Sequence, residues 1–192
     1  MNKSNLRKIY LEKRKDLAPA ERKQKSRAIA DLFFQNFDLK KIRFLHCFVP
    51  IKKFGEIETG FIYEKIWRRF PGVQTLAPRV DFSIGEIESF VFAPAVPLAE
   101  NVWQIREPVN GEPIDAEKID AVLIPLLCFD RRGFRVGYGK GFYDKFLRKC
   151  RNDCPKIGLS FFEPIEKITD ARDFDVELDF CVTPETVYEF GK

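Results

Sequence analysis

Hydrophobic residues near the start of the chain recur at helical spacing, with Lys and Arg filling many positions between them. A first helix is expected behind Ser4, a residue type that caps helix N-termini. A second helix is expected to begin at Pro19, because proline suits the first helical turn. The apolar positions that define the two helices are Leu6, Ile9, Tyr10 and Leu17, then Ala28, Ile29, Leu32 and Phe33. The pattern therefore predicts two basic helices at the start of the fold.

Short apolar runs of strand length alternate with a helical pattern in the next part of the chain. FLHCFV at 44–49 is followed by a helix behind Thr59 and then by a turn and strand in PGVQTLAPRV at 71–80, which makes a β-α-β unit. SFVFA at 89–93 predicts another strand. Residues 97–113, rich in Pro, have no pattern that assigns an element and are a candidate for lining a site. The apolar face of the helix behind the Thr cap is Ile62, Ile66, Trp67 and Phe70.

The run DAVLIPLLCF at 120–129 is apolar almost without interruption, as expected of a strand buried on both faces of a parallel or mixed sheet. FYDKFLRKC at 142–150 has the spacing of a helix start, and KIGLSFF at 156–162 and DFCVT at 179–183 predict two more strands. With 192 residues, 45% of them hydrophobic, the chain can bury one sizeable core. We therefore predict a single α/β domain over residues 1–192, a three-layer open sheet with parallel core strands flanked by helices.

Charge is distributed unevenly, although the formal net charge is only +4. Residues 1–27 carry ten Lys or Arg against three acidic residues, a net charge of +7, which leaves −3 for the remainder. Such a segment attracts polyanions, namely nucleic acid, acidic lipid or a small polyanionic substrate, although a solvated helix face is its commonest meaning. No run approaches the roughly 20 apolar residues that span a bilayer, and the charged start lacks the apolar core of a secretion signal. We expect a cytoplasmic protein that engages no membrane.

Cysteine and histidine offer little chemistry. The five cysteines are odd in number and scattered, which is typical of reduced core thiols, and Cys150 and Cys154 lack the further ligands that a tetrahedral metal site needs. His46 is the only histidine and lies in an apolar run, where a buried ring with satisfied hydrogen bonds is the expected role. No nucleophile that depends on histidine is predicted.

The segment RRGFRVGYGKGFYDKFL at 131–147 carries the strongest signal for chemistry. Its four glycines lack Cβ atoms and let backbone N–H groups converge on an anion, and the helix expected near Phe142 adds its positive end. Arg135 and Lys140 add full charges, and Asp144 is a residue type that holds magnesium beside phosphate oxygens. In open α/β sheets, ligands bind where a strand ends and the next helix begins. These parts suit a nucleoside triphosphate better than the alternative, a glycine-rich surface turn.

Two common phosphate-binding motifs fail on spacing. The lysine of a Walker loop is followed by Ser or Thr, whereas Gly141 follows Lys140. The dinucleotide fingerprint requires a glycine where Phe142 stands. The loop belongs to neither class.

FDRRGFRVGYGKGFYDKFL at 129–147 closely resembles the signature of the 5-formyltetrahydrofolate cyclo-ligase family, whose members are also called methenyltetrahydrofolate synthetases. Other segments resemble the family in the same order: KSNLRKIYLEKR, GEIET, LAPR, VWQIREP and DFDVELDFCVTP. The resemblance implies an α/β fold of the sugar-phosphate isomerase and CoA-transferase type. It also implies an enzyme that uses ATP and Mg2+ to close 5-formyltetrahydrofolate to 5,10-methenyltetrahydrofolate, releasing ADP and phosphate. Its partners would be the folate and ATP, and we expect a monomer.

In the mechanism that the resemblance implies, the formyl oxygen attacks the γ-phosphate, N10 closes the ring and phosphate leaves. A protein that aligns these groups and neutralises their charge needs no nucleophilic side chain. The catalytic residues assigned in this way are Arg135, Lys140 and Tyr143. Lys3 and Arg7, which lie four apart and so on one helical face, match ATP-contacting positions. The resemblance assigns the rest of the ATP site to Arg135, Val136, Gly137, Tyr138, Gly139, Lys140, Gly141, Phe142 and Tyr143.

For the folate, the resemblance assigns Glu56, since a carboxylate complements the donor-rich amino-pyrimidine edge of a pterin. Glu58 is the rival if the register slips, and a surface acid is the ordinary alternative. Trp103 is expected to wall the folate pocket, although a lone tryptophan is as often part of a core. The other positions assigned to the folate are Val49 or Ile51, Tyr138 and Phe142.

Asp144 and Asp175 match the magnesium carboxylates of the family, although Asp144 is also placed to complement a helix dipole. Two departures from the family pattern matter. VPIKKFGEIET is about two residues longer than usual, which leaves Val49 against Ile51 open, and Phe174 stands where a histidine often precedes the matching aspartate.

Three other functions stay open from the sequence. A different ATP-dependent ligase would use the same loop, and a nucleotide-binding regulator would keep the loop without needing Glu56 or Trp103. A nucleic-acid-binding protein would use residues 1–27 as a basic arm, but the rest of the chain is net acidic. We therefore expect no nucleic-acid partner.

Overall fold

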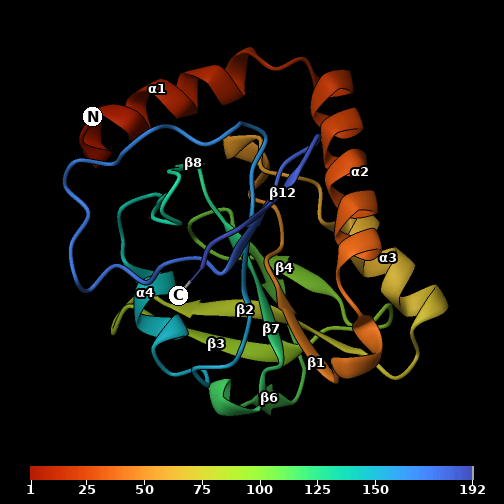
Figure 1. The fold of residues 1–192 in the computed structure, drawn as a ribbon. Coiled ribbons are helices and arrows are strands. Elements are labelled where there is room, and N and C mark those ends of the chain that lie inside the picture. Colours follow the sequence, from red (N-terminus) through yellow and green to blue (C-terminus); the bar gives the residue numbers. More distant parts are fainter. Residues whose placement is uncertain (192) are drawn as a thin grey trace.

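A mixed eight-stranded sheet forms the centre of the computed structural model, which describes residues 1–191 (Figure 1). The strand order is β12-β11-β10-β7-β1-β2-β3-β6. The five strands from β11 to β2 run parallel, whereas β12, β3 and β6 are each antiparallel to their neighbours. These strands are β1 (Phe44–Cys47), β2 (Gln74–Asp81), β3 (Glu86–Val91), β6 (Pro113–Ile114), β7 (Ala121–Pro125), β10 (Lys156–Leu159), β11 (Phe180–Val182) and β12 (Val187–Glu189).

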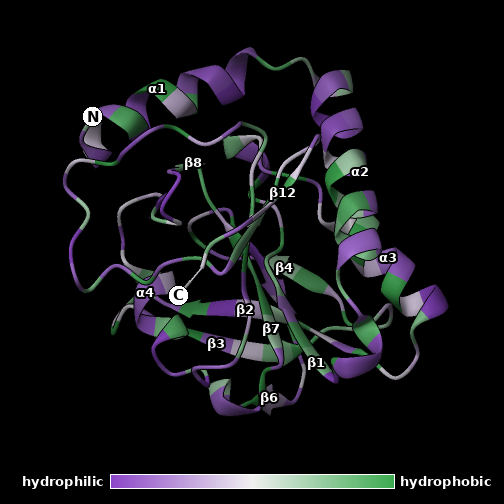
Figure 2. Ribbon diagram, in the orientation of Figure 1, coloured by the Kyte–Doolittle hydropathy of each residue, from purple (hydrophilic) through white to green (hydrophobic). Residues whose placement is uncertain are grey.

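Helices cover both faces of the sheet, so the predicted three-layer α/β architecture is confirmed. α2 (Pro19–Asn36) and α3 (Gly60–Arg69) bury Phe33 and Ile66 against one face, in a core that includes Leu45 and Leu123. α4 (Phe142–Leu147) buries Phe146 against the other face. Figure 2 shows hydrophobic residues gathered on the central strands, whereas α1 and the first turns of α2 are largely hydrophilic. No helix within residues 1–191 has the length and apolar character needed to cross a bilayer.

Helix α1 (Lys3–Asp16) lies across the carboxyl ends of the parallel strands instead of on a sheet face (Figure 1). Leu6 and Tyr10 are buried against Leu127 and Val136, just beyond the end of β7. The expected Ser4 cap is wrong: the Asn2 side chain accepts from the N–H of Asn5 at 2.9 Å, and Ser4 lies within the first turn. The helix start predicted at Pro19 is confirmed.

The apolar run 120–129 is not one strand. β7 ends at Pro125, which has no N–H to continue the ladder, and β8 (Cys128–Phe129) leaves the sheet to pair with β9 (Arg135–Val136). The segment 97–113, which had no assignable pattern, contains the hairpin of β4 (Leu98–Glu100) and β5 (Arg106–Pro108). Three short 3-10 helices, η1 (Leu39–Lys41), η2 (Lys52–Phe54) and η3 (Ala116–Lys118), complete the elements of residues 1–191.

Close packing around Gly158, on the sheet face that α4 covers, gives a test of the core. A Cβ atom on Gly158 in β10 would lie 2.7 Å from methyl carbons of Leu126 and Leu178, whereas a Cβ on Gly72 would meet nothing within 4 Å. We expect Gly158→Ala to lower the free energy of unfolding by roughly 1–3 kcal/mol, because core atoms must move to admit the methyl group. Gly72→Ala should stay within about 0.5 kcal/mol of the parent. Urea unfolding measures both, and equal stabilities would contradict the packing.

Candidate active site

A cavity of about 640 Å³ opens at the carboxyl edge of the sheet. Its walls come from α1, the loop between β9 and α4, the segment after β1, strand β2 and the β4–β5 hairpin. This volume is in the range of pockets that enclose small-molecule ligands. The cavity is lined by almost every residue predicted for the site: Lys3, Arg7, Val49, Ile51, Glu56, Trp103, Arg135, Gly137, Tyr138, Gly139, Lys140, Gly141, Phe142, Tyr143, Asp144 and Asp175.

Val136 is the exception among the predicted site residues. It is 1% exposed and packs with Leu6 and Tyr10 in the small core beneath α1. Its side chain therefore does not line the cavity, and only its backbone is left for a ligand.

The glycine loop is held against α1 by Arg7. The Arg7 Nε donates to the carbonyl oxygen of Gly137 at 2.9 Å, and a Cβ built on Gly139 would lie 3.0 Å from the guanidinium. Gly139 has a φ of +88° and Gly141 a φ of +70°, a left-handed conformation that favours glycine. Backbone freedom and close approach both explain why glycine occupies position 139.

Glu56 is a buried carboxylate of the cavity wall, at 9% exposure. One of its oxygens accepts from the Tyr138 hydroxyl at 2.6 Å, and the other accepts from the N–H of Ile51 at 2.7 Å. Burial raises the pKa of Glu56, while these hydrogen bonds and the positive charge of Arg14 lower it. Glu58 is exposed, accepts from the N–H of Gly60 at 3.1 Å and does not line the cavity.

The two predicted magnesium carboxylates are each paired with a predicted phosphate-binding cation. Lys3 Nζ lies 2.5 Å from an oxygen of Asp175, and an Arg135 Nη lies 2.7 Å from an oxygen of Asp144. Burial lowers the pKa of Arg135, and the neighbouring Asp144 opposes that effect. Asp144 also accepts from the N–H of Val176 at 3.1 Å, so the pairs join α1, α4 and the segment before β11.

Asp130 fixes the start of the glycine-rich segment, a role that the sequence reading did not assign. It is fully buried and accepts from the N–H groups of Arg132 at 3.0 Å and Ile168 at 2.9 Å. The Arg132 guanidinium pairs with it at 2.7 Å. One carboxylate thus ties the loop to the chain segment that leads to Asp175.

Aromatic rings wall the cavity on two sides. Phe54 stacks on Tyr138 with ring centroids 4.7 Å apart. Phe82 lies between Trp103 and Phe142, at 5.3 Å and 5.7 Å respectively. Trp103 is 53% exposed, so it is not a core residue. Nothing in the sequence separates Phe54 and Phe82 from the other 18 phenylalanines.

His46 is buried, as predicted, with both ring nitrogens near hydroxyl groups. Nδ1 lies 2.8 Å from Ser89 Oγ and Nε2 lies 3.4 Å from the Tyr143 hydroxyl. Burial lowers the pKa of His46 to about 3, so the ring is neutral near pH 7. A neutral ring has one donor and one acceptor nitrogen, so it can hydrogen-bond to both hydroxyl groups and help to hold Tyr143 in place. The five cysteines are buried and free, which confirms the expected core thiols.

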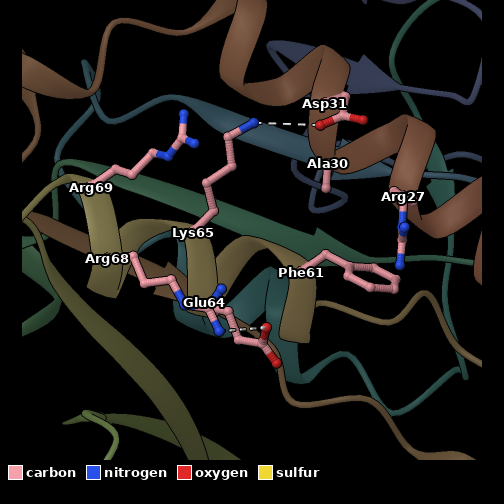
Figure 3. Close-up of a pocket in the computed structure, with 8 residues that line it drawn as sticks. All are labelled: Arg27, Ala30, Asp31, Phe61, Glu64, Lys65, Arg68 and Arg69. Carbon is pink, nitrogen blue, oxygen red and sulfur yellow. Dashed lines mark hydrogen bonds and ion pairs between the residues drawn. The ribbon is translucent and has the colours of Figure 1, made fainter.

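A second, smaller pocket of about 350 Å³ lies between α2 and α3 (Figure 3). Its charges are largely paired with each other: Lys65 lies 3.4 Å from Asp31, and Arg68 lies 3.9 Å from Glu64. None of the predicted site residues lines it. The cavity at the carboxyl edge is therefore the candidate active site.

A mixed α/β sheet with cations, carboxylates, a glycine loop and aromatic rings around one cavity is the arrangement of an enzyme that binds a phosphate-rich ligand beside a flat one. Residues 1–184 match the profile of the 5-formyltetrahydrofolate cyclo-ligase family, and the chain belongs to this family. It is an ATP-dependent cyclo-ligase that converts 5-formyltetrahydrofolate to 5,10-methenyltetrahydrofolate, as predicted, and the other functions considered are not favoured.

Relatives and solved structures agree over most of the chain. The 5-formyltetrahydrofolate cyclo-ligase of Escherichia coli K12 is 28% identical over 140 residues, which cover 71% of this chain and 76% of that one. That of Mycoplasma pneumoniae is 27% identical over 189 residues, 96% of this chain and all of the other. The NMR structure of Aquifex aeolicus 5,10-methenyltetrahydrofolate synthetase superposes with a TM-score of 0.84 at 29% identity, covering 100% of this chain and 94% of that one. This agreement supports the fold described above.

Proposed function

We propose that the cavity holds ATP along the glycine loop and the pterin ring over Glu56, so that the formyl oxygen faces the γ-phosphate. The observation that carries this arrangement is the position of Tyr138. Its hydroxyl donates to Glu56 at 2.6 Å, and the next two residues along the chain are Gly139 and Lys140. A ligand group on Glu56 and a phosphate on the loop would therefore be neighbours.

On the ATP side, the loop N–H groups and four cations meet the phosphates. Lys140 is exposed and makes no hydrogen bond or ion pair with any residue of the described chain, so its charge is free for a ligand. Lys3, Arg7 and Arg135 complete the set on the same cavity. Phosphoryl transfer depends mainly on positioning and charge stabilisation, which these groups supply without a nucleophile.

Asp144 and Asp175 fit a magnesium ion, because both are carboxylates on the ATP side of one cavity. Magnesium in nucleotide sites is commonly held by one or two carboxylates together with phosphate oxygens, so two protein ligands are enough. When bound there, the ion would neutralise charge on the phosphates.

On the folate side, Glu56 accepts hydrogen bonds from the amino-pyrimidine edge, while Phe54 and Trp103 flank the ring system. The formyl oxygen attacks the γ-phosphorus and ADP leaves. N10 then attacks the formyl carbon and loses its proton to solvent, and the C–O bond breaks as phosphate leaves, which gives the methenyl bridge. Burial raises the pKa of Tyr143 well above its usual range, so its hydroxyl keeps its proton and donates to the developing charge. We also propose that residues 1–192 act as one catalytic domain, as a monomer in the cytoplasm.

The direct test is an absorbance assay for methenyltetrahydrofolate with purified protein, 5-formyltetrahydrofolate and magnesium. We expect product only when ATP is present, with one ADP released for each product formed. Product without ATP, or ATP hydrolysis without product, would contradict the proposed chemistry.

Glu56→Gln should lower kcat/KM for 5-formyltetrahydrofolate by roughly 30-fold, since losing a charge-assisted hydrogen bond costs about 2 kcal/mol. The KM for ATP should change little, because only the pterin, of the two substrates, is proposed to contact this carboxylate. Glu58→Gln is the matched control and should behave as the parent. Equal effects on both substrates would contradict the assignment of Glu56.

Lys140→Ala should raise the KM for ATP about tenfold, because it removes a phosphate-facing charge worth about 1.4 kcal/mol. It should not change the urea midpoint, since the side chain is exposed and unpaired in the described chain. The control is Lys118→Ala in η3, an exposed lysine at the amino end of β7 that does not line the cavity. An unchanged ATP requirement in Lys140→Ala would exclude a phosphate role.

A further inference from the structure

Arg14 is a buried charge next to the cavity that the reaction described above does not use. It is 2% exposed, although it sits on α1 among exposed lysines. One Nη donates to the Tyr138 hydroxyl at 2.8 Å, and the other donates to the carbonyl oxygen of Leu126. Its Nε has no hydrogen-bond partner among residues 1–191. Burying a cation in this way is costly unless a negative group repays it.

The negative group is Glu56, reached through one hydroxyl. A guanidinium can only donate, so the Tyr138 oxygen must accept from Arg14. The Tyr138 proton is then directed at Glu56, whose oxygen lies 2.6 Å away. The direction of each hydrogen bond in the chain Arg14, Tyr138, Glu56 is thereby fixed.

We propose that Arg14 is a positioning residue of the folate site, which acts through Tyr138 to keep Glu56 negatively charged and oriented toward the pterin. This inference rests on the proposed role of Glu56. Each carboxylate oxygen of Glu56 accepts one protein hydrogen bond and has capacity for a second, from the ligand.

The groups that face Glu56 support a pH test. Tyr138 comes from the glycine loop, Tyr143 from α4, Arg14 from α1 and the N–H of Ile51 from the segment after β1. Both tyrosines stay protonated, since burial raises their pKa values, so Arg14 supplies the opposing positive charge. Burial raises the pKa of Glu56 and Arg14 lowers it. Removing Arg14 should raise the pKa of Glu56 further. As the pH is lowered, Glu56 would then lose its negative charge at a higher pH than in the parent.

The experiment compares Arg14→Met with the parent across pH. We expect kcat/KM for 5-formyltetrahydrofolate to fall roughly tenfold at pH 7, as is usual when a supporting hydrogen bond behind a ligand-binding group is lost. The acid limb of its pH profile should move to higher pH, whereas the KM for ATP should change less than about twofold. Arg14→Lys should recover part of the loss. Lys13→Met, an exposed neighbour on α1, is the matched control and should leave the profile unchanged.

A second variant separates positioning from folding. If Arg14→Met lowers the urea midpoint strongly, Tyr138→Phe is the alternative, because it removes the hydroxyl that links Arg14 to Glu56 and keeps the buried arginine. It should also move the acid limb of the pH profile to higher pH. In the double variant, the two losses should not add, because both remove one pathway. Unchanged acid limbs in both single variants, or fully additive losses, would overturn the inference.

Failure of the proposed function can be distinguished from failure of the Arg14 inference. If the parent forms no methenyl product with ATP, the reaction assignment is wrong, and calorimetric binding of 5-formyltetrahydrofolate across pH still tests Arg14. Weaker binding by Arg14→Met, with the loss greatest at low pH, would support the positioning role. Parent-like binding at every pH would overturn it.

Discussion

The docking of α1 across the carboxyl edge of the sheet is the contact on which the whole cavity depends. Lys3, Arg7 and Arg14 are spaced by four and seven residues, so they lie on one face of the helix. That face also carries Leu6 and Tyr10, whose burial against the chain beyond β7 holds the helix in place. A modest apolar contact therefore delivers three cations, one each to the Asp175 carboxylate, the glycine loop and the Tyr138 hydroxyl. Loss of this docking would weaken both halves of the site while the sheet stayed intact.

Ion pairs connect the charged residues in the part of the cavity that we assign to ATP. Lys3, Arg135, Asp144 and Asp175 form two ion pairs, so neither the two cations nor the two carboxylates are left to repel each other. A nucleotide with a bound divalent ion brings both signs of charge at once. Each protein charge can then exchange one opposite partner for another, and such an exchange avoids the cost of leaving a partly buried charge alone. The same residues thus pair with each other and can also pair with the proposed ligand.

The sequence predicts the parts of this site that form a motif of neighbouring residues, and it misses the parts that tertiary packing decides. Glycines at alternate positions after an apolar run indicate the loop that lines the cavity, and family resemblance adds Glu56 and Asp175 from distant segments. Arg14 could not be selected, because ten Lys or Arg residues crowd positions 1–27 and only tertiary docking decides which is buried. Phe54 has the same problem among 20 phenylalanines. The break at Pro125 was hidden by uniform hydrophobicity, which signals burial but not where a strand leaves its sheet.

Tyr138 couples the two halves of the cavity through one residue. Its backbone belongs to the glycine loop, its ring stacks on Phe54, and its hydroxyl joins Arg14 to Glu56. The hydroxyl that orients Glu56 is therefore carried by the same loop that we assign to the phosphates. In the proposed arrangement, one residue thus places the pterin contact next to the phosphate loop, and the chemistry needs no nucleophilic side chain.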